Sequence, residues 1–594
     1  MLLLCSWARL FGDKGLDSRG EVEVPKGRIA PWLARPLWEN RQIYLKVGLA
    51  AVMINIFQLV TSLFTMTVYD RVIPNNAMDS LVGLTIGLLI VVVFDFVLKL
   101  LRAYFVDVAG ARIDRDMGEE IFQQILNMRL DLRRGSTGSL AGLVREIETL
   151  RDFFASATLT ALVDLPFILI TVAVMALIGG WIVAVPVLLI PLVVVTALLT
   201  QPVMRRLSAE VLGEALGKQS VLVETIGSLE TVKSANAGPM LAKRWDKAVI
   251  EHAASSLRQR LISTISINMA GSAQMLAYTG VVVVGVFMIA DGKLTMGALI
   301  ACSILSSRVV APLGGIAQLL TRINATQTAY NQINRMMEQP PEGPTGEGLP
   351  VLNLRGALEF RDVDFRYPNA PELALTGVNF RIDAGEHVAL IGPIGSGKST
   401  IARLLIGLYT PASGLVMVDG TDIRQLRPTE LRAKVGALFQ DNVLMTGSIR
   451  ENIQLGRAGI GDEEMLRAAQ ISGAHDFISQ FPAGYDLRLA DRGEGLSGGQ
   501  RQAIAMARAL AGSPQVLILD EPTSSVDTDT ENRLIQKLKN EFAGRTLILI
   551  THRPSLLALV DRVIVLARGR VVMDGPTQQV VNRVRGVTTQ VAKQ

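Results

Sequence analysis

The sequence contains very little cysteine. Only two of its 594 residues are cysteines, Cys5 and Cys302, and they lie in different regions of the chain. Two such thiols cannot form a disulfide framework or a cysteine-ligated zinc cluster. We interpret both as incidental thiols, with a lipoprotein-like use of Cys5 as the alternative.

The chain is also poor in charge. Charged residues make up 19% of it and hydrophobic residues 49%, and the mean hydropathy is +0.35. This balance favours a protein with part of its surface in lipid over a fully soluble one. The net charge of +5 does not indicate a nucleic-acid partner, because the basic residues lie beside apolar stretches, where they set membrane topology.

The start of the sequence lacks a secretory signal, and the long apolar stretches come later. The opening "MLLLCSWARLFGDKG" has too short an apolar run for a signal peptide, so we expect no cleaved leader. Six stretches are long enough to cross about 30 Å of hydrocarbon and predict membrane-spanning helices. They cover residues 43–68, 79–101, 154–178, 181–203, 261–290 and 296–319.

The connections between these stretches alternate between short and long. The short ones, 69–80, 178–181 and 290–295, hold two basic residues together, Arg71 and Lys293. The long ones, 102–152 and 204–260, hold many basic residues and read as helical continuations of the spans. The positive-inside rule places the long segments in the cytoplasm, and an even number of spans places both termini there as well.

Several ionisable residues fall inside or beside the predicted spans. Asp95 and Lys99 are four positions apart, and we expect them to pair on one helix face. For Asp164 and Arg308, helix packing and the lining of a substrate path remain equally open, because charge in a membrane usually faces a partner or a water-filled route.

A proline- and glycine-rich stretch, "EQPPEGPTGEGLP" at 338–350, divides the chain and predicts a linker. After it, short β-type runs alternate with helical stretches, which is typical of an α/β domain. The predicted organisation is a short cytoplasmic segment (1–42), an all-α transmembrane domain with six helices (43–337), the linker, and an α/β domain (351–594).

The run "HVALIG" leads directly into "GPIGSGKST", which has the strand, loop and helix setting of a P-loop. The glycines allow backbone N–H groups to point at phosphate oxygens, Lys398 supplies a positive charge for them, and the Ser399 hydroxyl can bind Mg²⁺. The loop comprises Gly392, Pro393, Ile394, Gly395, Ser396, Gly397, Lys398, Ser399 and Thr400. The sequence therefore predicts binding of ATP with Mg²⁺.

Two further strands end in residues suited to phosphate chemistry. "VLILDE" is an apolar strand followed by Asp520, a candidate ligand of Mg²⁺, and Glu521, a candidate general base for the attacking water. "TLILIT" is followed by His552. Because ligands bind at the carboxyl ends of strands in open α/β sheets, we expect all three side chains at the same site.

A second glycine-rich loop, "LSGGQ" at 496–500, completes a set of motifs that resembles the ATP-binding cassette (ABC) proteins. With six spans in front of the cassette, the chain resembles an ABC exporter half-transporter along nearly its whole length. The resemblance implies that Tyr367 stacks on adenine, that Gln440 senses Mg²⁺ and that Asp527 belongs to the D-loop. His552 would contact the γ-phosphate.

The resemblance also implies a homodimer. Two cassettes would pack head to tail, so that Ser497, Gly498, Gly499 and Gln500 of one chain close over ATP held by the P-loop of the other. A helix start with free N–H groups suits that role. Short coupling helices that dock on the cassettes are expected near residues 111–119 and 210–219.

Within exporters, several strings most resemble the ATPase-permeases of bacterial type I secretion systems. They are "YDRVIPNNA", "DLPFILI", "DRGEGLSGGQRQAIAMARAL" and "THRPSLL". The resemblance implies export of an unprocessed protein of the repeat-in-toxin (RTX) type across the inner membrane, with a periplasmic adaptor and an outer-membrane channel as partners. Many relatives carry a peptidase domain before the first span, whereas about 42 residues precede it here, so we do not expect this chain to cleave a leader.

Two other functions remain open at this point. The same cassette could power an exporter of lipid, drug or other small amphipathic molecules. An ATP-gated channel or a chromosome-associated ATPase is a third class, but the predicted spans argue against the soluble member of this class, and Glu521 with His552 argues against an inactive gate.

Overall fold

A computed structural model of the chain describes residues 29–132, 137–154, 164, 166–344, 348–368, 370–455, 459–524 and 526–583. These residues fold as two compact units. The described residues up to Leu126 and from Thr137 to Gln339 form a helical unit. Those from Asn127 to Leu132 and from Pro340 onward form a unit of strands and helices. Cys5 lies outside the described residues, and Cys302 is a buried, unpaired thiol.

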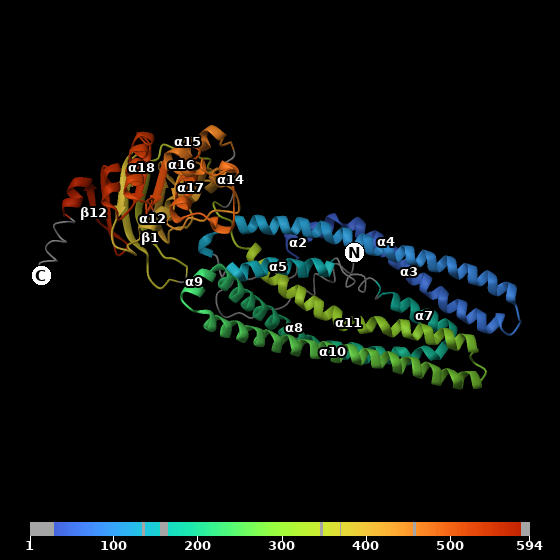
Figure 1. Cartoon of the computed structure of the whole chain (residues 1–594). Helices are drawn as coiled ribbons and strands as arrows, with labels where there is room; N and C mark the ends of the chain where they lie inside the picture. Colours follow the sequence, from blue (N-terminus) through green and yellow to red (C-terminus); the bar gives the residue numbers. More distant parts are fainter. Residues whose placement is uncertain are drawn as a thin grey trace. The chain divides into compact units, whose positions relative to one another are not determined.

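The helical unit is built from long helices that run alongside one another (Figure 1). In chain order its elements are α2 (Pro31–Glu39), α3 (Arg41–Thr67), the π-helical turn η1 (Val68–Val72), α4 (Met78–Leu126), α5 (Thr137–Phe154), α7 (Phe167–Gly179), η3 (Gly180–Val183), α8 (Ala184–Gly227), α9 (Leu229–Ser234), α10 (Gly238–Ala290) and α11 (Met296–Met337). At 1.5 Å per residue, α10 extends about 80 Å, far beyond a hydrocarbon layer of about 30 Å. The helical continuation of the spans is therefore confirmed.

Within the described residues, four helical segments are long and apolar enough to cross a membrane. They are Arg41–Val72, Met78–Leu126, Phe167–Gly227 and Gly238–Ala290, and Met296–Pro312 is a shorter apolar helix. A break at Gly180, which has a φ of 58°, divides Phe167–Gly227 where the third and fourth expected spans meet. Residues 155–163 of the expected third span lie outside the described residues, so the count of six remains a prediction.

The expected positions of the two coupling helices are wrong. Residues 111–119 lie inside α4, and residues 210–219 lie inside α8, with no break at either place. The chain instead interrupts its helices after Leu126, where the 3₁₀ turn η2 (Leu130–Leu132) follows, and at Ser228, where the short α9 begins. The short elements η2 and α9 begin about ten residues beyond the end of the two expected ranges.

Three of the four predicted intramembrane charges have side-chain partners. Lys99 Nζ lies 2.6 Å from Asp95 Oδ2, which confirms the expected pair on one helix face. Asp164 accepts hydrogen bonds from Arg102 on α4, at 3.2 Å to each carboxylate oxygen, and from Asn55 on α3, at 3.1 Å. Asp164 thus joins two neighbouring helices.

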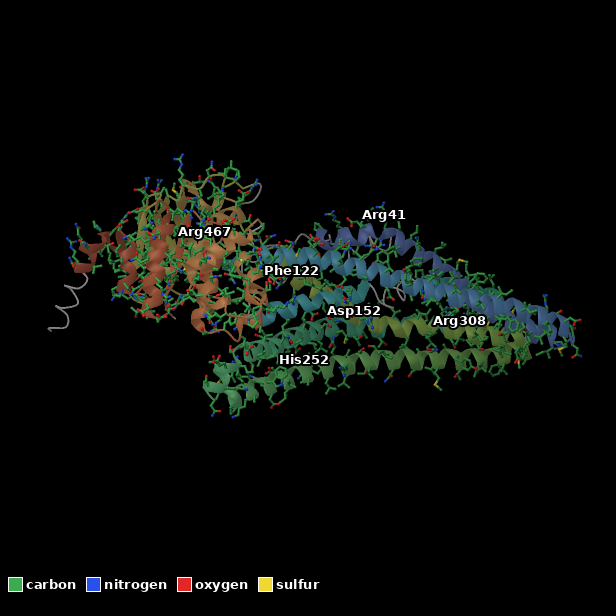
Figure 2. The ribbon with its side chains drawn as sticks, turned by 45° about the horizontal axis from the view of Figure 1, so that its top comes forward. Arg41, Phe122, Asp152, His252, Arg308 and Arg467 are labelled. Carbon is green, nitrogen blue, oxygen red and sulfur yellow. The ribbon has the colours of Figure 1, made fainter. Side chains whose placement is uncertain are left out.

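Arg308 lies on α11 within the bundle and away from its ends (Figure 2). Its Nη1 donates a hydrogen bond to the backbone carbonyl of Gln58 on α3. This contact links α11 to α3 through the backbone and not through an acidic side chain.

The second unit contains a six-stranded sheet and a four-stranded antiparallel sheet. The six-stranded order is β12 (Arg570–Pro576), β11 (Arg562–Ala567), β3 (His387–Ile391), β10 (Thr546–Ile550), β9 (Val516–Asp520), β6 (Val435–Leu438), with β12 alone antiparallel to its neighbour. The other sheet is β2 (Leu375–Ile382), β1 (Leu358–Phe365), β4 (Ser413–Val418), β5 (Thr421–Asp422). A short pair joins β7 (Gly447–Ser448) and β8 (Arg488–Leu489).

Each central strand of the six-stranded sheet is buried on both faces. In β9, Leu517 and Leu519 face a core shared with helices, whereas Val516 and Ile518 face a core shared with the four-stranded sheet. The helices of the unit are α12 (Lys398–Leu405), α13 (Pro428–Lys434), α14 (Ile449–Gln454), α15 (Asp462–Ser472), α16 (Ala474–Ile478), α17 (Gly498–Leu510) and α18 (Thr528–Glu541). The predicted α/β P-loop architecture is confirmed.

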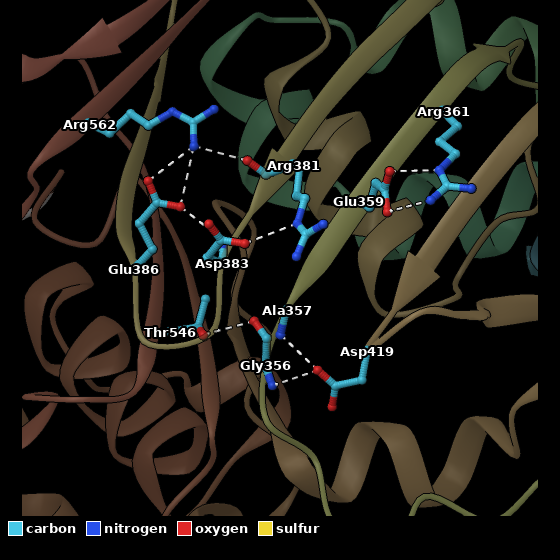
Figure 3. Close-up of polar contacts among 10 residues, drawn as sticks. All are labelled: Gly356, Ala357, Glu359, Arg361, Arg381, Asp383, Glu386, Asp419, Thr546 and Arg562. Carbon is cyan, nitrogen blue, oxygen red and sulfur yellow. Dashed lines mark hydrogen bonds and ion pairs between the residues drawn. The ribbon is translucent and has the colours of Figure 1, made fainter.

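Figure 3 shows polar contacts within and between the two sheets. Asp419, after β4, accepts from the backbone N–H groups of Gly356 and Ala357 at 3.1 and 2.8 Å. Thr546, which begins β10, donates to the carbonyl of Gly356 at 2.8 Å. Arg562 of β11 pairs with Glu386 before β3 at 3.0 Å. The bond from Thr546 to Gly356 joins the two sheets, and the pair of Arg562 with Glu386 holds the start of β3, the strand that leads into the P-loop.

Candidate functional site

The P-loop connects β3 to α12 by a path that only glycine can follow at two positions. Gly392 has a φ of 149° and Gly397 a φ of 101°, both in the region that side chains rarely adopt. A Cβ at Gly392 would lie 2.1 Å from the carbonyl oxygen of Leu566, and one at Gly397 would lie 2.5 Å from Leu375 Cδ2. The loop is therefore packed tightly from below and leaves its other side open, where Ile394 is 95% exposed.

Lys398 is held inside the loop. Its ammonium group donates to the carbonyl oxygens of Gly392 and Pro393 at 2.8 and 2.9 Å, and Ser396 Oγ lies 3.5 Å away. Burial lowers the pKa of Lys398, and the charges of Asp520 and Glu521 oppose that effect. This arrangement keeps a desolvated positive charge at the centre of the loop, ready to exchange carbonyl oxygens for phosphate oxygens.

Asp520 ends β9 beside the first turn of α12. Its side chain is 2% exposed and accepts a hydrogen bond from the Ser399 hydroxyl. Burial raises the pKa of Asp520, and Ser399, Arg403, Lys398 and His552 all oppose that effect. A buried carboxylate next to a hydroxyl at the phosphate end of a P-loop is the donor set that Mg²⁺ prefers, so these residues fit the ion.

Glu521 is turned away from the strand by an unusual backbone conformation. Its φ is 51°, and its N–H donates to the carbonyl of Ile550 on β10 at 2.8 Å. Oε1 of Glu521 is buried without a hydrogen-bond partner among the described residues, and it lies 3.9 Å from His552 Nε2. Burial raises the pKa of this carboxyl, and His552 opposes the effect. A non-glycine residue held at positive φ with an unpaired buried oxygen is suited to receive a proton from a bound molecule.

The structure thus brings Lys398, Ser399, Asp520, Glu521 and His552 together, as the sequence predicts. His552 is the most accessible of them, since half of its side chain is exposed. It follows β10, the neighbour of β9 in the sheet, so the register of two parallel strands places it beside Glu521.

Tyr367 has neighbours that the sequence did not indicate. Its hydroxyl lies 3.1 Å from Thr400 Oγ1 and accepts from Arg403 at 2.9 Å, both on α12. Its ring meets Phe365 and Tyr409 edge to face, with centroids 4.9 and 5.3 Å apart. Tyr367 therefore supports the helix under the P-loop, and its stacking on adenine remains a prediction.

Gln440 lies two residues beyond β6 and is exposed. Because β6 is the parallel neighbour of β9, its carboxyl end lies at the same edge of the sheet as Asp520. This position is compatible with the predicted approach to Mg²⁺, which no contact within the described residues tests.

The LSGGQ loop forms the start of α17. Ser497 caps the helix by accepting from the N–H of Gln500 at 3.2 Å, and the Gln500 side chain accepts from the N–H of Ser497 at 2.8 Å. This capping box leaves the N–H groups of Gly498 and Gly499 for another acceptor. Ser497 and Gly498 are exposed. The loop is therefore a preformed anion site facing out of its own domain.

Asp527 caps α18, and neighbouring residues that the sequence did not reveal support it. Its side chain accepts from the N–H of Thr530 at 3.0 Å, which lowers its pKa. Arg553, next to His552, donates to the buried Glu531 of α18 and to the carbonyl of Val526. The His552 turn and the Asp527 turn are thus joined by one guanidinium.

Gln502 is a second residue that the motifs did not reveal. It is 6% exposed, and its Nε2 donates to the carbonyl of Glu521 at 2.8 Å and to Ser524 Oγ at 3.2 Å. The available signal was a polar residue on the buried face of an otherwise apolar helix. Gln502 connects the helix of the LSGGQ loop directly to the residue proposed as general base.

Comparison with known proteins places both units in one family. The sequence pattern of the "ABC transporter" domain matches residues 375–524, and that of the "ABC transporter transmembrane region" matches residues 44–313. The chain is 34% identical over 561 residues to the leukotoxin translocation ATP-binding protein LktB of Mannheimia haemolytica, covering 94% of this chain and 78% of that protein. A protein of the same name from Bibersteinia trehalosi is 33% identical over the same length.

A solved structure agrees over the same extent. The structure of a bacterial Atm1-family ABC exporter with ATP bound superposes with a TM-score of 0.84 at 25% identity, covering 91% of this chain and 96% of that one.

Proposed function

Because this chain belongs to the ABC transporter family, we propose that it is the inner-membrane ATPase of a type I secretion system and exports a protein of the RTX type. The observation that carries this proposal is the similarity to leukotoxin translocation proteins across both units and not in the cassette alone. The membrane strings "YDRVIPNNA" and "DLPFILI" support the same conclusion, since the cassette motifs are common to exporters of any cargo.

In this proposal the P-loop holds ATP and the residues at the sheet edge hydrolyse it. Lys398 and the loop N–H groups bind the phosphates, Glu521 accepts a proton from the attacking water, and His552 contacts the γ-phosphate. Gln502 fixes the backbone of Glu521 through its carbonyl. Ser399 and Asp520, with Gln440, would hold Mg²⁺, which when bound neutralises charge on the phosphates.

The working unit is a homodimer. Each chain supplies one P-loop and one LSGGQ loop, and the latter points its free N–H groups outward from a capped helix. A second copy would complete two ATP sites by placing Ser497, Gly498 and Gly499 over the partner's nucleotide. Binding of ATP closes the dimer and hydrolysis opens it.

The chain is a membrane protein, and we place it in the bacterial inner membrane with both termini and the ATPase domain in the cytoplasm. The basic residues of the long connections support that orientation. A periplasmic adaptor and an outer-membrane channel would then carry the protein substrate onward.

A comparison of secreted proteins tests the proposal. Culture supernatants of three strains would be analysed by mass spectrometry: wild type, a deletion of this gene, and a strain expressing the Glu521→Gln variant at the wild-type level. One or a few proteins should disappear from the medium in both mutant strains. An unchanged set of secreted proteins in the deletion strain would refute protein export.

The alternative is an exporter of lipid, drug or other small amphipathic molecules on the same fold. It predicts altered membrane lipids or drug sensitivity in the deletion strain, with the secreted proteins unchanged. The same three strains therefore distinguish the two functions.

A further inference from the structure

One face of α4 carries three charged residues within the helical unit. Asp95, Lys99 and Arg102 recur at helical spacing, four and three residues apart, so they line one side of the helix. Lys99 pairs with Asp95, and Arg102 pairs with Asp164. A row of this kind in an apolar segment is costly and calls for a function.

Arg308 adds a further positive charge, which interacts with the charge of Asp95. It lies on α11, about 18 Å along the helix from its first residue, by the rise of 1.5 Å per residue. Among the described residues, however, no carboxylate lies within ion-pair distance of Arg308, and its guanidinium donates only to the backbone carbonyl of Gln58.

The charges of this region do not balance. Asp95 and Asp164 supply two negative charges, whereas Lys99, Arg102 and Arg308 supply three positive ones. Arg102 and Asp164 neutralise each other, and Asp95 is engaged by Lys99 through Oδ2. One positive charge, centred on Arg308, is left for an anion.

The local backbone also departs from a regular helix. Pro312 lies inside α11, four residues after Arg308, and it has no N–H to donate to the carbonyl of Arg308. In addition, Asp95 Oδ1 is a buried oxygen without a partner among the described residues. A helix hydrogen bond that Pro312 cannot make and a buried carboxylate oxygen of Asp95 without a partner in the described part of the chain are typical of a functional site and not of tight helix packing.

We propose that Arg308 binds a carboxylate side chain of the polypeptide as it is translocated. The proposal rests on the proposed function, since it names what the exporter recognises in its protein substrate. The planar guanidinium can hold a carboxylate through two parallel hydrogen bonds. Asp95, held by Lys99, would limit this binding by repulsion, so that the acidic segment is released and moves on.

A binding titration on the full-length homodimer in phosphatidylcholine nanodiscs tests this inference. Two fluorescent peptides serve as probes: one alternates Glu with Ser, and the other has Gln at every Glu position. Binding is followed by fluorescence anisotropy. Wild type should bind the Glu peptide about tenfold more tightly than the Gln peptide, the effect of one charge-assisted hydrogen-bonded pair. Arg308→Gln should remove that preference.

The matched control is Lys293→Gln. This substitution also removes one positive charge, but from the exposed turn between α10 and α11, where Lys293 pairs with Asp291. It should leave the preference for Glu intact. If Arg308→Gln failed to assemble, Arg308→Lys should weaken binding of the Glu peptide about threefold, because the charge remains and the fork is lost. Unchanged preference in Arg308→Gln, or unchanged binding in Arg308→Lys, would overturn the proposal.

The lipid headgroup is the other source of an anion. If the effect of Arg308→Gln appears only in nanodiscs that contain phosphatidylglycerol, the ligand is a lipid and the proposal fails. Failure of this inference can be told apart from failure of the proposed function. If the deletion strain loses proteins from the medium but wild type binds the two peptides equally, the Arg308 site is rejected and protein export stands.

Discussion

Asp520 and Glu521 are adjacent carboxylates in different surroundings. Asp520, at the end of β9, accepts a hydrogen bond from the Ser399 hydroxyl of α12, whereas Oε1 of Glu521 is buried without a partner among the described residues. Burial raises the pKa of both carboxyl groups. The difference in partners separates a residue that holds a cation from one that takes up a proton.

Because the pKa of Glu521 is raised in the folded protein, its ionised side chain is expected to lower the stability of the fold. Because its pKa is higher in the folded than in the unfolded chain, its contribution to stability is present at low pH and is lost as the pH rises through the folded value. Glu521→Gln should therefore raise Tm at pH 8 by about 2–4 °C, the effect of about 1 kcal/mol in a domain of this size. The gain should vanish near pH 4.

Thermal unfolding of the purified full-length protein without nucleotide or Mg²⁺ would measure this difference. Glu541→Gln, which removes a carboxylate paired with Arg467 and Arg545 at the end of α18, serves as the control and should show no such pH-dependent gain. A lower Tm for Glu521→Gln at pH 8 would contradict the raised pKa.

Tyr367 allows the role of its hydroxyl to be separated from that of its ring. Tyr367→Phe removes the hydrogen bonds to Thr400 and Arg403 but keeps the aromatic contacts. We expect a loss of about 1–2 kcal/mol in stability, with a KM for ATP within about twofold of wild type, since stacking needs only the ring. ATPase kinetics and thermal unfolding test this together.

Tyr367→Ala is the companion variant. It should raise KM for ATP if the ring stacks on adenine. A large rise of KM in Tyr367→Phe would instead show that the hydroxyl itself contacts the nucleotide.

At the scale of elements, the capping box of α17 stabilises the start of the helix and, in the proposed dimer, places Ser497 at the partner's ATP. One substitution can separate these two roles. Ser497→Asp keeps a good N-cap, because Asp caps helices as well as Ser does. It also places a negative charge where the partner's γ-phosphate would sit. We expect Tm to stay within about 1 °C of wild type, since the cap is retained, while ATP hydrolysis falls at least about a hundredfold.

Ser497→Ala provides the contrast, since it loses the cap, at a cost of about 1 kcal/mol, without adding charge. Binding of a fluorescent ATP analogue should be normal in both variants, because Lys398 is untouched. Near-normal hydrolysis by Ser497→Asp would mean that this loop does not approach phosphate.

The helices also show where the sequence could be read and where it could not. The strands β3, β9 and β10 were predictable because each contains an apolar run of four residues, VALI, VLIL and LILI, that ends before the motif residues. The predicted positions of the coupling helices are wrong, although glycine- and proline-containing segments mark the places where the long helices end. "RRGSTG" follows η2, and Gly227 and "NAGP" flank α9. Residues 111–119 and 210–219 contain only isolated glycines, Gly118, Gly213 and Gly217, and the helices continue through them.

At the scale of the site, the residues of the motifs were predictable, whereas the residues that hydrogen-bond to them and to their neighbours were not. Lys398, Asp520, Glu521 and His552 follow strands whose parallel order brings their ends together. Gln502 and Arg553 act through contacts between elements distant in sequence, such as Arg553 with Glu531 of α18. Spacing along the chain carries no information about such contacts, so only the fold reveals them.

For the whole molecule, the decisive question is whether each ATP site is built from one chain or from two. Mixed dimers purified through two different tags answer it with Lys398→Met and Ser497→Asp. In the trans arrangement each chain carries one substitution, and in the cis arrangement one chain carries both while its partner is wild type. If sites are shared, trans leaves one complete site, formed by the intact P-loop of one chain and the intact LSGGQ loop of the other. Cis damages both sites.

If each chain instead formed its own site, the result would reverse, because cis would spare the wild-type chain and trans would spare neither. We therefore expect ATPase activity in the trans dimer of up to about half the wild-type rate, and a loss of at least about a hundredfold in the cis dimer. The two dimers contain the same substitutions in the same number, so differences in folding or in membrane insertion cannot produce this pattern. Activity in cis and none in trans would show that the LSGGQ loop serves its own P-loop, and the homodimeric site would have to be abandoned.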